Sequence, residues 1–239
     1  MVVSRVKTYV RGFDDALNGG IPEGYVTLVS GAPGTMKSSL TFSILYNNAL
    51  QEGRKSAYFT LEQSRGILLE HMHELGMTDE KAYKNLSVLD MGTVRKNLNF
   101  LQARGTWIEL FKMYASNFMK SEKISLLVLD SLDVLETMAK FQDRRTELYY
   151  LFEWLRDLGT TTLVISESPI EAPPGGRYLE EAFLADGIIQ MSLHQTSDVY
   201  VQRRLRCVKM RSTKHETGFH ALAFDDGRFE LTRAVNGVG

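Results

Sequence analysis

Glycine, lysine and serine residues near the start of the chain have a spacing that suits phosphate chemistry. The segment consists of Gly31, Ala32, Pro33, Gly34, Thr35, Met36, Lys37, Ser38 and Ser39. It follows an apolar run at 25–29 and opens a helical pattern at 37–51. Consecutive backbone amides at a helix N-terminus attract the clustered negative charges of a triphosphate. Lys37 would then reach the β- and γ-phosphates, and the Ser38 hydroxyl would bind Mg²⁺.

One residue departs from the usual phosphate-loop pattern. Met36 stands where a glycine usually precedes the lysine. If the backbone there must be left-handed, a methionine costs about 1–2 kcal/mol. The phosphate donors are backbone amides and survive the substitution, so we expect nucleotide binding to persist. The alternative, a chance Gly/Pro turn before a helix, does not account for the strand that precedes the loop.

Short apolar runs alternate with longer helical patterns along most of the chain. Several of these runs are continuously apolar, which is typical of parallel strands covered on both faces. Their alternation with helices predicts βαβ units, a mostly parallel sheet and the α/β fold class. The expected strands are 25–29, 57–61, 86–90, 124–129, 162–166 and 188–192, and the expected helices are 37–51, 65–75, 107–119 and 144–157.

The C-terminal third has a different pattern. Runs at 201–211, 219–224 and 228–231 predict antiparallel strands, the last two joined by an Asp-Gly turn at 226–227. We find no linker and expect one domain over residues 1–239. The Pro- and Gly-rich stretch 167–177 is expected to lack regular structure, either as a functional or mobile loop or as a solvated connector.

Bulk composition limits the possible classes of protein. Hydrophobic residues make up 44% and charged residues 24%, as in ordinary soluble globular proteins. The net charge of −1 gives no global attraction to nucleic acid or to an anionic membrane. No apolar run approaches the roughly 18–20 residues that cross a bilayer, and residues 1–11 lack the features of a secretory signal. Cys207 is the only cysteine, which fits a cytoplasmic protein without disulfides.

The segment 12–24 and the phosphate loop after it resemble the RecA superfamily. The resemblance is closest to its KaiC-like branch, named for the circadian-clock ATPase, and it extends over nearly the whole chain. It implies a RecA-like P-loop core that binds ATP or ADP with Mg²⁺ and hydrolyses ATP slowly. It also implies a homo-oligomer, a hexameric ring with nucleotide at the subunit interfaces. Such a switch could have a regulatory protein partner; nucleic acid is not the favoured partner.

The resemblance gives a role to a glutamate after the second strand. Glu62 follows the run 57–61, where a carboxylate can orient the water that attacks the γ-phosphate. KaiC has two adjacent glutamates at this place, whereas the second residue here is Gln63. One ionisable carboxylate instead of two argues against fast hydrolysis. The alternative role for Glu62 is that of an exposed helix cap.

Acids also end two later strands. Asp130 follows 124–129, at the sheet edge where ligands of parallel sheets bind, and it could hold Mg²⁺ through water. Glu167 follows 162–166, which resembles the sensor strand of the family. An ordinary strand-end acid is the alternative for both residues.

A basic segment at 203–215 offers further candidate residues for the nucleotide site. Lys209 and Arg211 are two residues apart on an expected strand, so their side chains point to the same side. KaiC-like domains have a Lys-x-Arg pair here that reaches the γ-phosphate bound by the neighbouring subunit. His215 also matches a histidine of that pattern. The alternatives are a solvated basic strand and a nucleic-acid patch.

Three functions remain open from the sequence. The favoured one is the KaiC-like ATPase switch. A second is a RecA-like recombinase paralogue that binds single-stranded DNA through a loop at 167–183, although Arg177 is the only strongly basic residue there. A third is a non-catalytic nucleotide sensor, which Met36 and Gln63 make credible.

Overall fold

The computed structural model describes residues 4–100, 106–167 and 180–234. The strands are β1 (Arg5–Val6), β2 (Ile21–Pro22), β3 (Val26–Ser30), β4 (Ser56–Thr60), β5 (Leu86–Asp90), β6 (Leu126–Asp130), β7 (Thr161–Ser166), β8 (Gly187–Gln195), β9 (Val201–Met210), β10 (His220–Asp225) and β11 (Arg228–Arg233). The helices are α1 (Phe13–Ala16), α2 (Lys37–Glu52), α3 (Arg65–Glu74), α4 (Glu80–Tyr83), α5 (Met91–Phe100), α6 (Trp107–Glu122), α7 (Leu132–Ala139), α8 (Arg144–Asp157) and α9 (Glu180–Leu184).

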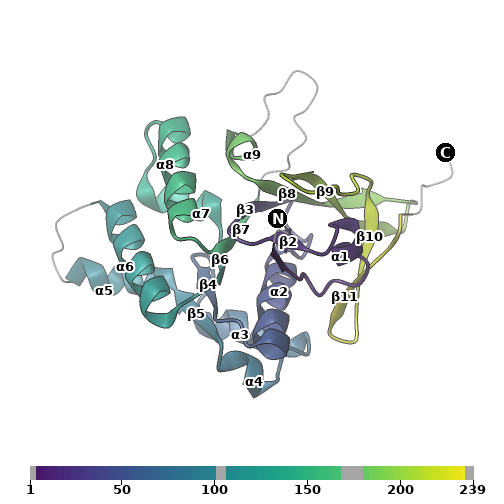
Figure 1. Ribbon diagram of the computed structural model, residues 1–239, viewed down its shortest axis with the longest axis horizontal. Coiled ribbons are helices and arrows are strands. Elements are labelled where there is room, and N and C mark those ends of the chain that lie inside the picture. Colours follow the sequence, from purple (N-terminus) through teal and green to yellow (C-terminus); the bar gives the residue numbers. More distant parts are fainter. Residues whose placement is uncertain (1–3, 101–105, 168–179, 235–239) are drawn as a thin grey trace.

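A nine-stranded sheet in the order β11-β10-β9-β8-β3-β7-β6-β4-β5 forms the centre of the protein (Figure 1). The strands from β8 to β5 in that order pair in parallel, and β9, β10 and β11 add to the sheet antiparallel. This confirms the predicted α/β class, with a mostly parallel sheet and C-terminal antiparallel strands.

The parallel strands bury side chains on both faces. In β4, Tyr58 packs in the core that contains α2 and α3, whereas Ala57 and Phe59 pack in the core that contains α6 and α8. Figure 1 shows α6, α7 and α8 on the opposite side of the strands from α2. Burial on two faces explains why these strands are continuously apolar in the sequence.

Most predicted boundaries agree with the structure within one to three residues. The helices α1, α4, α5, α7 and α9 and the strands β1 and β2 were not predicted. The α5 helix and the α7 helix follow the ends of β5 and β6 directly. The β8 strand runs three residues further than expected, because its polar end, including His194, pairs with β9. The predicted turn at Asp226 and Gly227 is confirmed, with φ angles of 44° and 71°. The stretch 168–177 of the predicted irregular loop lies outside the described residues.

Candidate functional site

The phosphate loop lies between the C-terminal end of β3 and the first turn of α2. Gly31 passes so close to β8 that a Cβ atom there would lie 2.3 Å from the Met191 carbonyl oxygen. Only glycine fits such a close backbone approach. Gly34 has a φ of 82°, in the left-handed region that also favours glycine. The loop therefore requires glycine at Gly31 because of a close backbone approach, and favours it at Gly34 because of the left-handed φ.

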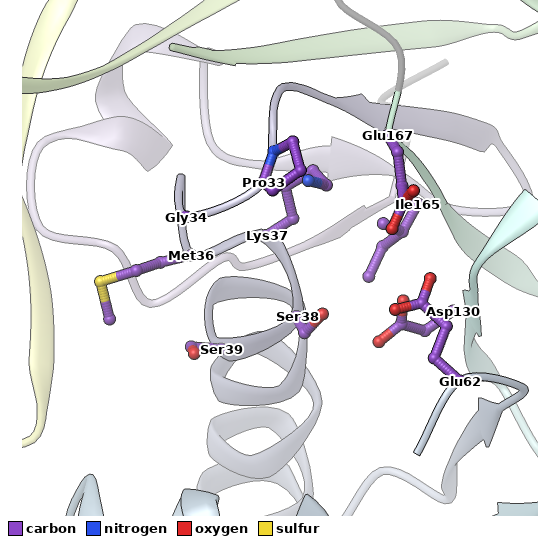
Figure 2. A pocket seen from close by; sticks show the side chains of 10 residues that line it. All are labelled: Pro33, Gly34, Met36, Lys37, Ser38, Ser39, Glu62, Asp130, Ile165 and Glu167. Atoms are coloured by element: carbon purple, nitrogen blue, oxygen red, sulfur yellow. The ribbon is translucent and has the colours of Figure 1, made fainter. Parts of the chain in front are cut away.

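Met36 is the residue at which the loop turns into α2. Its φ of 71° and ψ of 32° lie in the left-handed region. The backbone at this methionine is therefore strained by about 1–2 kcal/mol. The side chain is half-buried against the core around α2. Figure 2 shows it pointing away from the acidic side of the loop. Its apolar packing offsets part of the backbone strain.

Lys37 is held inside the loop itself. Its side chain is buried, and its Nζ donates hydrogen bonds to the carbonyl oxygens of Gly31 (2.8 Å) and Ala32 (3.1 Å). Burial lowers the pKa of the Lys37 ammonium, and the negative charges of nearby carboxylates oppose that effect. The ammonium group is thus fixed in an acidic environment beside the loop amides.

A cavity of about 310 Å³ opens beside the loop. Figure 2 shows carboxylates from strand ends facing the start of α2 across it. The cavity is lined by Pro33, Gly34, Met36, Lys37, Ser38, Ser39, Glu62, Asp130, Ile165 and Glu167. Residues that the sequence analysis selected from four separate segments therefore meet at one place.

Asp130 is the buried acid of this cavity. It ends β6 and is 3% exposed, and burial raises the pKa of its carboxyl. Its Oδ2 accepts a hydrogen bond from the Tyr58 hydroxyl, and Ser38 also hydrogen-bonds to it. Burial, followed by the negative charge of Asp130, raises the pKa of Tyr58 well above its ordinary value, so the phenol remains a donor. Sequence reasoning missed Tyr58, because a tyrosine in an apolar strand is typical of core packing.

Glu62 and Glu167 form the exposed rim of the cavity. Their carboxyl groups lie close to each other at this rim. Burial and then the negative charge of Glu62 raise the pKa of the Glu167 carboxyl. The backbone N–H of Glu167 donates to Oδ2 of Asp133 at 2.8 Å, which ties the end of β7 to α7. Asp133 is a second residue that the sequence analysis did not select, because α7 itself was not predicted.

Lys209 and Arg211 lie at the end of β9 and contact their own chain. Lys209 Nζ donates to the carbonyl oxygen of Ala185 at 2.6 Å. The Arg211 guanidinium pairs with Asp186 Oδ1 at 2.7 Å. Both cations reach the same segment, which confirms that they point to one side. Neither is among the described residues that line the cavity around Lys37.

The sequence model of the KaiC ATPase family matches residues 6–232. The chain belongs to the KaiC family. It is 32% identical over 234 residues to a UPF0273 protein of Aeropyrum pernix, which covers 94% of this chain and 92% of that protein. It is 25% identical to the circadian clock oscillator protein KaiC of Synechococcus elongatus, over 94% of this chain but only 43% of the clock protein. The crystal structure of a KaiC-like protein from Pyrococcus horikoshii matches with a TM-score of 0.80 and 26% identity, over 97% of this chain and all of that one.

Membership of the KaiC family makes this a RecA-fold protein from a family of nucleotide-binding ATPases. Gln63 stands where the resemblance implies a second glutamate, and its side-chain oxygen is buried without a hydrogen-bond partner in the described part of the chain. His215, which the resemblance assigns to the nucleotide site, has its Nδ1 3.1 Å from the Thr213 carbonyl oxygen. Within the described residues, no helix is both long enough and apolar enough to cross a membrane.

Proposed function

We propose that this KaiC-family chain is a slow, Mg²⁺-dependent ATPase that works as a single domain within a homo-oligomeric ring. The proposal depends on one observation: Lys37, Ser38 and the carboxylates of Glu62 and Asp130 line the same cavity. Nucleotide would occupy that cavity at a boundary between subunits, and hydrolysis would change the conformation or the partner binding of the ring. By resemblance, the ring is a hexamer.

The loop residues 31–39 would bind the phosphates of ATP or ADP. Their backbone amides lie at the N-terminus of α2, where partial positive charge accumulates. Lys37 already has its ammonium beside the loop, on two carbonyl oxygens. We propose that it exchanges those carbonyls for the β- and γ-phosphate oxygens, which are stronger acceptors because they are charged.

The oxygen groups beside the loop fit Mg²⁺. Ser38 and Asp130 hydrogen-bond to each other, and hydroxyl, carboxylate and water oxygens are the ligands that Mg²⁺ selects. Ser38 would bind the ion directly and Asp130 would hold it through water. When bound, Mg²⁺ neutralises charge that develops on the phosphate oxygens.

Glu62 would act on the attacking water. It would orient the water toward the γ-phosphorus and accept its proton, while the bond to the β-phosphate oxygen breaks and ADP leaves. Lys209 and Arg211 would arrive from the neighbouring subunit and stabilise the departing charge. His215 would help to position that nucleotide.

The test is ATP turnover combined with the mass of the protein in solution. We expect phosphate release that requires Mg²⁺ and disappears in Lys37→Ala, together with a ring-sized assembly in the presence of ATP. Undiminished nucleotide binding by Lys37→Ala would refute the assigned site. A monomer that hydrolyses ATP at an ordinary rate would refute the contribution of a neighbouring subunit.

A second candidate is a nucleotide sensor that does not hydrolyse ATP. The strained Met36 and the replacement of a glutamate by Gln63 favour it. Such a sensor would bind Mg-ATP, yet release no more phosphate than Lys37→Ala. Glu62→Gln would then leave phosphate release unchanged.

A further inference from the structure

Tyr58 contacts both residues that we assign to Mg²⁺, although it does not line the cavity within the described part of the chain. Its side chain is fully buried in the middle of β4, and its ring packs on Phe42 with centroids 5.4 Å apart. Its hydroxyl donates to Oδ2 of Asp130, and the side chains of Ser38 and Thr41 lie beside the same hydroxyl. The Tyr58 hydroxyl thus bonds β4 to β6 and lies against the start of α2, directly behind the site.

We propose that Tyr58 is a positioning residue whose hydroxyl orients Asp130 and Ser38 for Mg²⁺. The inference rests on the proposed function, because it presupposes that Mg²⁺ and nucleotide bind in this cavity. It adds a residue to the site that neither the phosphate loop nor the strand-end acids identify.

Asp130 needs such a donor because it cannot turn to solvent. Asp130 is only 3% exposed. The terminal torsion of an aspartate has no strong preference, so the side chain alone does not fix the orientation of the carboxylate. A hydrogen bond to one oxygen fixes the plane of the group and leaves its other lone pairs for water or Mg²⁺. Residues that orient metal ligands in this way contribute strongly to metal affinity.

The chemical nature of the donor also fits a cation site. A phenol hydroxyl is neutral, so it orients the carboxylate without cancelling its charge. An arginine or lysine at the same place would compete with the metal ion for that charge. The parallel pairing of β4 with β6, in which Tyr58 lies opposite Val128 and Thr60 opposite Asp130, holds the two strands in register for this contact.

The test is a Mg²⁺ titration of nucleotide binding by Tyr58→Phe, which keeps the ring and removes only the hydroxyl. Binding of a fluorescent ATP analogue is followed as Mg²⁺ increases, and again in EDTA. We expect the half-saturating Mg²⁺ concentration to rise by about tenfold or more. Affinity for the analogue in EDTA should stay at the wild-type value, because the loop amides and Lys37 are untouched.

The matched control is Tyr46→Phe. Tyr46 is a buried tyrosine of α2, and its hydroxyl accepts a hydrogen bond from the Asp79 backbone at 2.8 Å. This variant also loses one buried hydroxyl contact, but far from the acids, so its Mg²⁺ dependence should equal that of the wild type. Equal shifts in the two variants would assign the effect to general stability and overturn the inference.

Two further outcomes separate this inference from the proposed function. If the wild-type protein shows no Mg²⁺-dependent nucleotide binding, the proposed function itself fails. If the wild type requires Mg²⁺ and Tyr58→Phe has an unchanged half-saturation, only the role of Tyr58 fails. Should Tyr58→Phe not fold, Thr41→Val removes the neighbouring hydroxyl that lies beside that of Tyr58, and an unchanged Mg²⁺ dependence there would likewise count against the inference.

Discussion

The Arg211 guanidinium lies 2.7 Å from an Asp186 carboxylate oxygen of the same chain. Asp186 also accepts a hydrogen bond from the backbone of Val26 at 3.1 Å and pairs with Arg156 at 3.3 Å. A single buried carboxylate therefore joins the start of β3, the helix α8 and the cation that we propose acts on a neighbouring subunit. This pairing holds the Arg211 guanidinium on its own subunit, while its side chain remains 52% exposed.

Replacing Asp186 by alanine should destabilise the fold. The Val26 N–H would lose its carboxylate acceptor, so we expect a loss of about 1–3 kcal/mol in the free energy of unfolding. The partly exposed guanidinium groups add little to this figure, because solvent screens them. Urea unfolding measures the loss, with exposed Asp157→Ala as the control. Similar losses in the two variants would contradict the structural role of Asp186.

Arg211→Ala should abolish ATP hydrolysis in a ring made only of this variant, because no neighbouring subunit then supplies the arginine. We expect a fall of about 10³-fold or more in turnover, the size seen for arginine fingers. Lys37→Ala should be equally inactive, because it cannot bind the phosphates. Mixing the two inactive variants should restore part of the activity, since some subunit boundaries then combine an intact Lys37 with an intact Arg211. Mixed rings without restored turnover would exclude action between subunits.

At position 36, glycine should be more stable than alanine. Helices normally favour alanine by about 1 kcal/mol, but the left-handed φ of 71° reverses that order by about 1–2 kcal/mol. Both Met36→Gly and Met36→Ala lack the methionine side chain, so the difference between them reports the backbone preference and not the lost packing. Urea unfolding of the two variants gives the difference directly. A more stable alanine variant would show that residue 36 is not left-handed in solution.

Glu62→Gln should separate binding from hydrolysis. The amide cannot accept the proton of the attacking water, so we expect turnover to fall by about 10²–10⁴-fold. Mg-ATP binding should persist, because Lys37 and the loop amides are unchanged. Phosphate release and equilibrium binding are measured on the same sample, with the exposed Glu70→Gln as control. Loss of binding in Glu62→Gln would assign this residue to the fold or to nucleotide affinity instead.

Stability without nucleotide should fall as the Glu167 carboxyl ionises. The pKa of Glu167 in the folded protein is raised above its ordinary value of 4.5, so the folded state holds this proton more tightly than the unfolded state. Its stabilising contribution is complete below pH 4.5 and is lost as pH rises through the folded-state pKa. Glu167→Gln should therefore match the wild type in acid and exceed its stability at neutral pH. Urea unfolding at several pH values tests this, and a gap that does not change with pH would contradict it.

The fold was largely predictable because its signals are local. Continuous apolar runs such as 126–129 can be buried on both faces only in a covered parallel sheet, and the antiparallel C-terminal strands carry their own Asp-Gly turn. Five of the described helices were not predicted. The helices α1, α4 and α9 have only four or five residues, too few for a clear helical pattern. The helices α5 and α7 begin within two residues of a strand end, so no loop separates their pattern from that of the strand.

The sequence by itself determined the phosphate loop and the strand-end position of Asp130, because the groups that define them are consecutive in the chain. Only the tertiary structure decided that Tyr58 contacts Asp130, 72 residues away, and that Asp186 holds Arg211. Those contacts depend on the order in which the strands assemble, here β7-β6-β4 on one side and β3-β8-β9 on the other. Strand order follows from how all the helices and strands pack together, and no local pattern of residues encodes it.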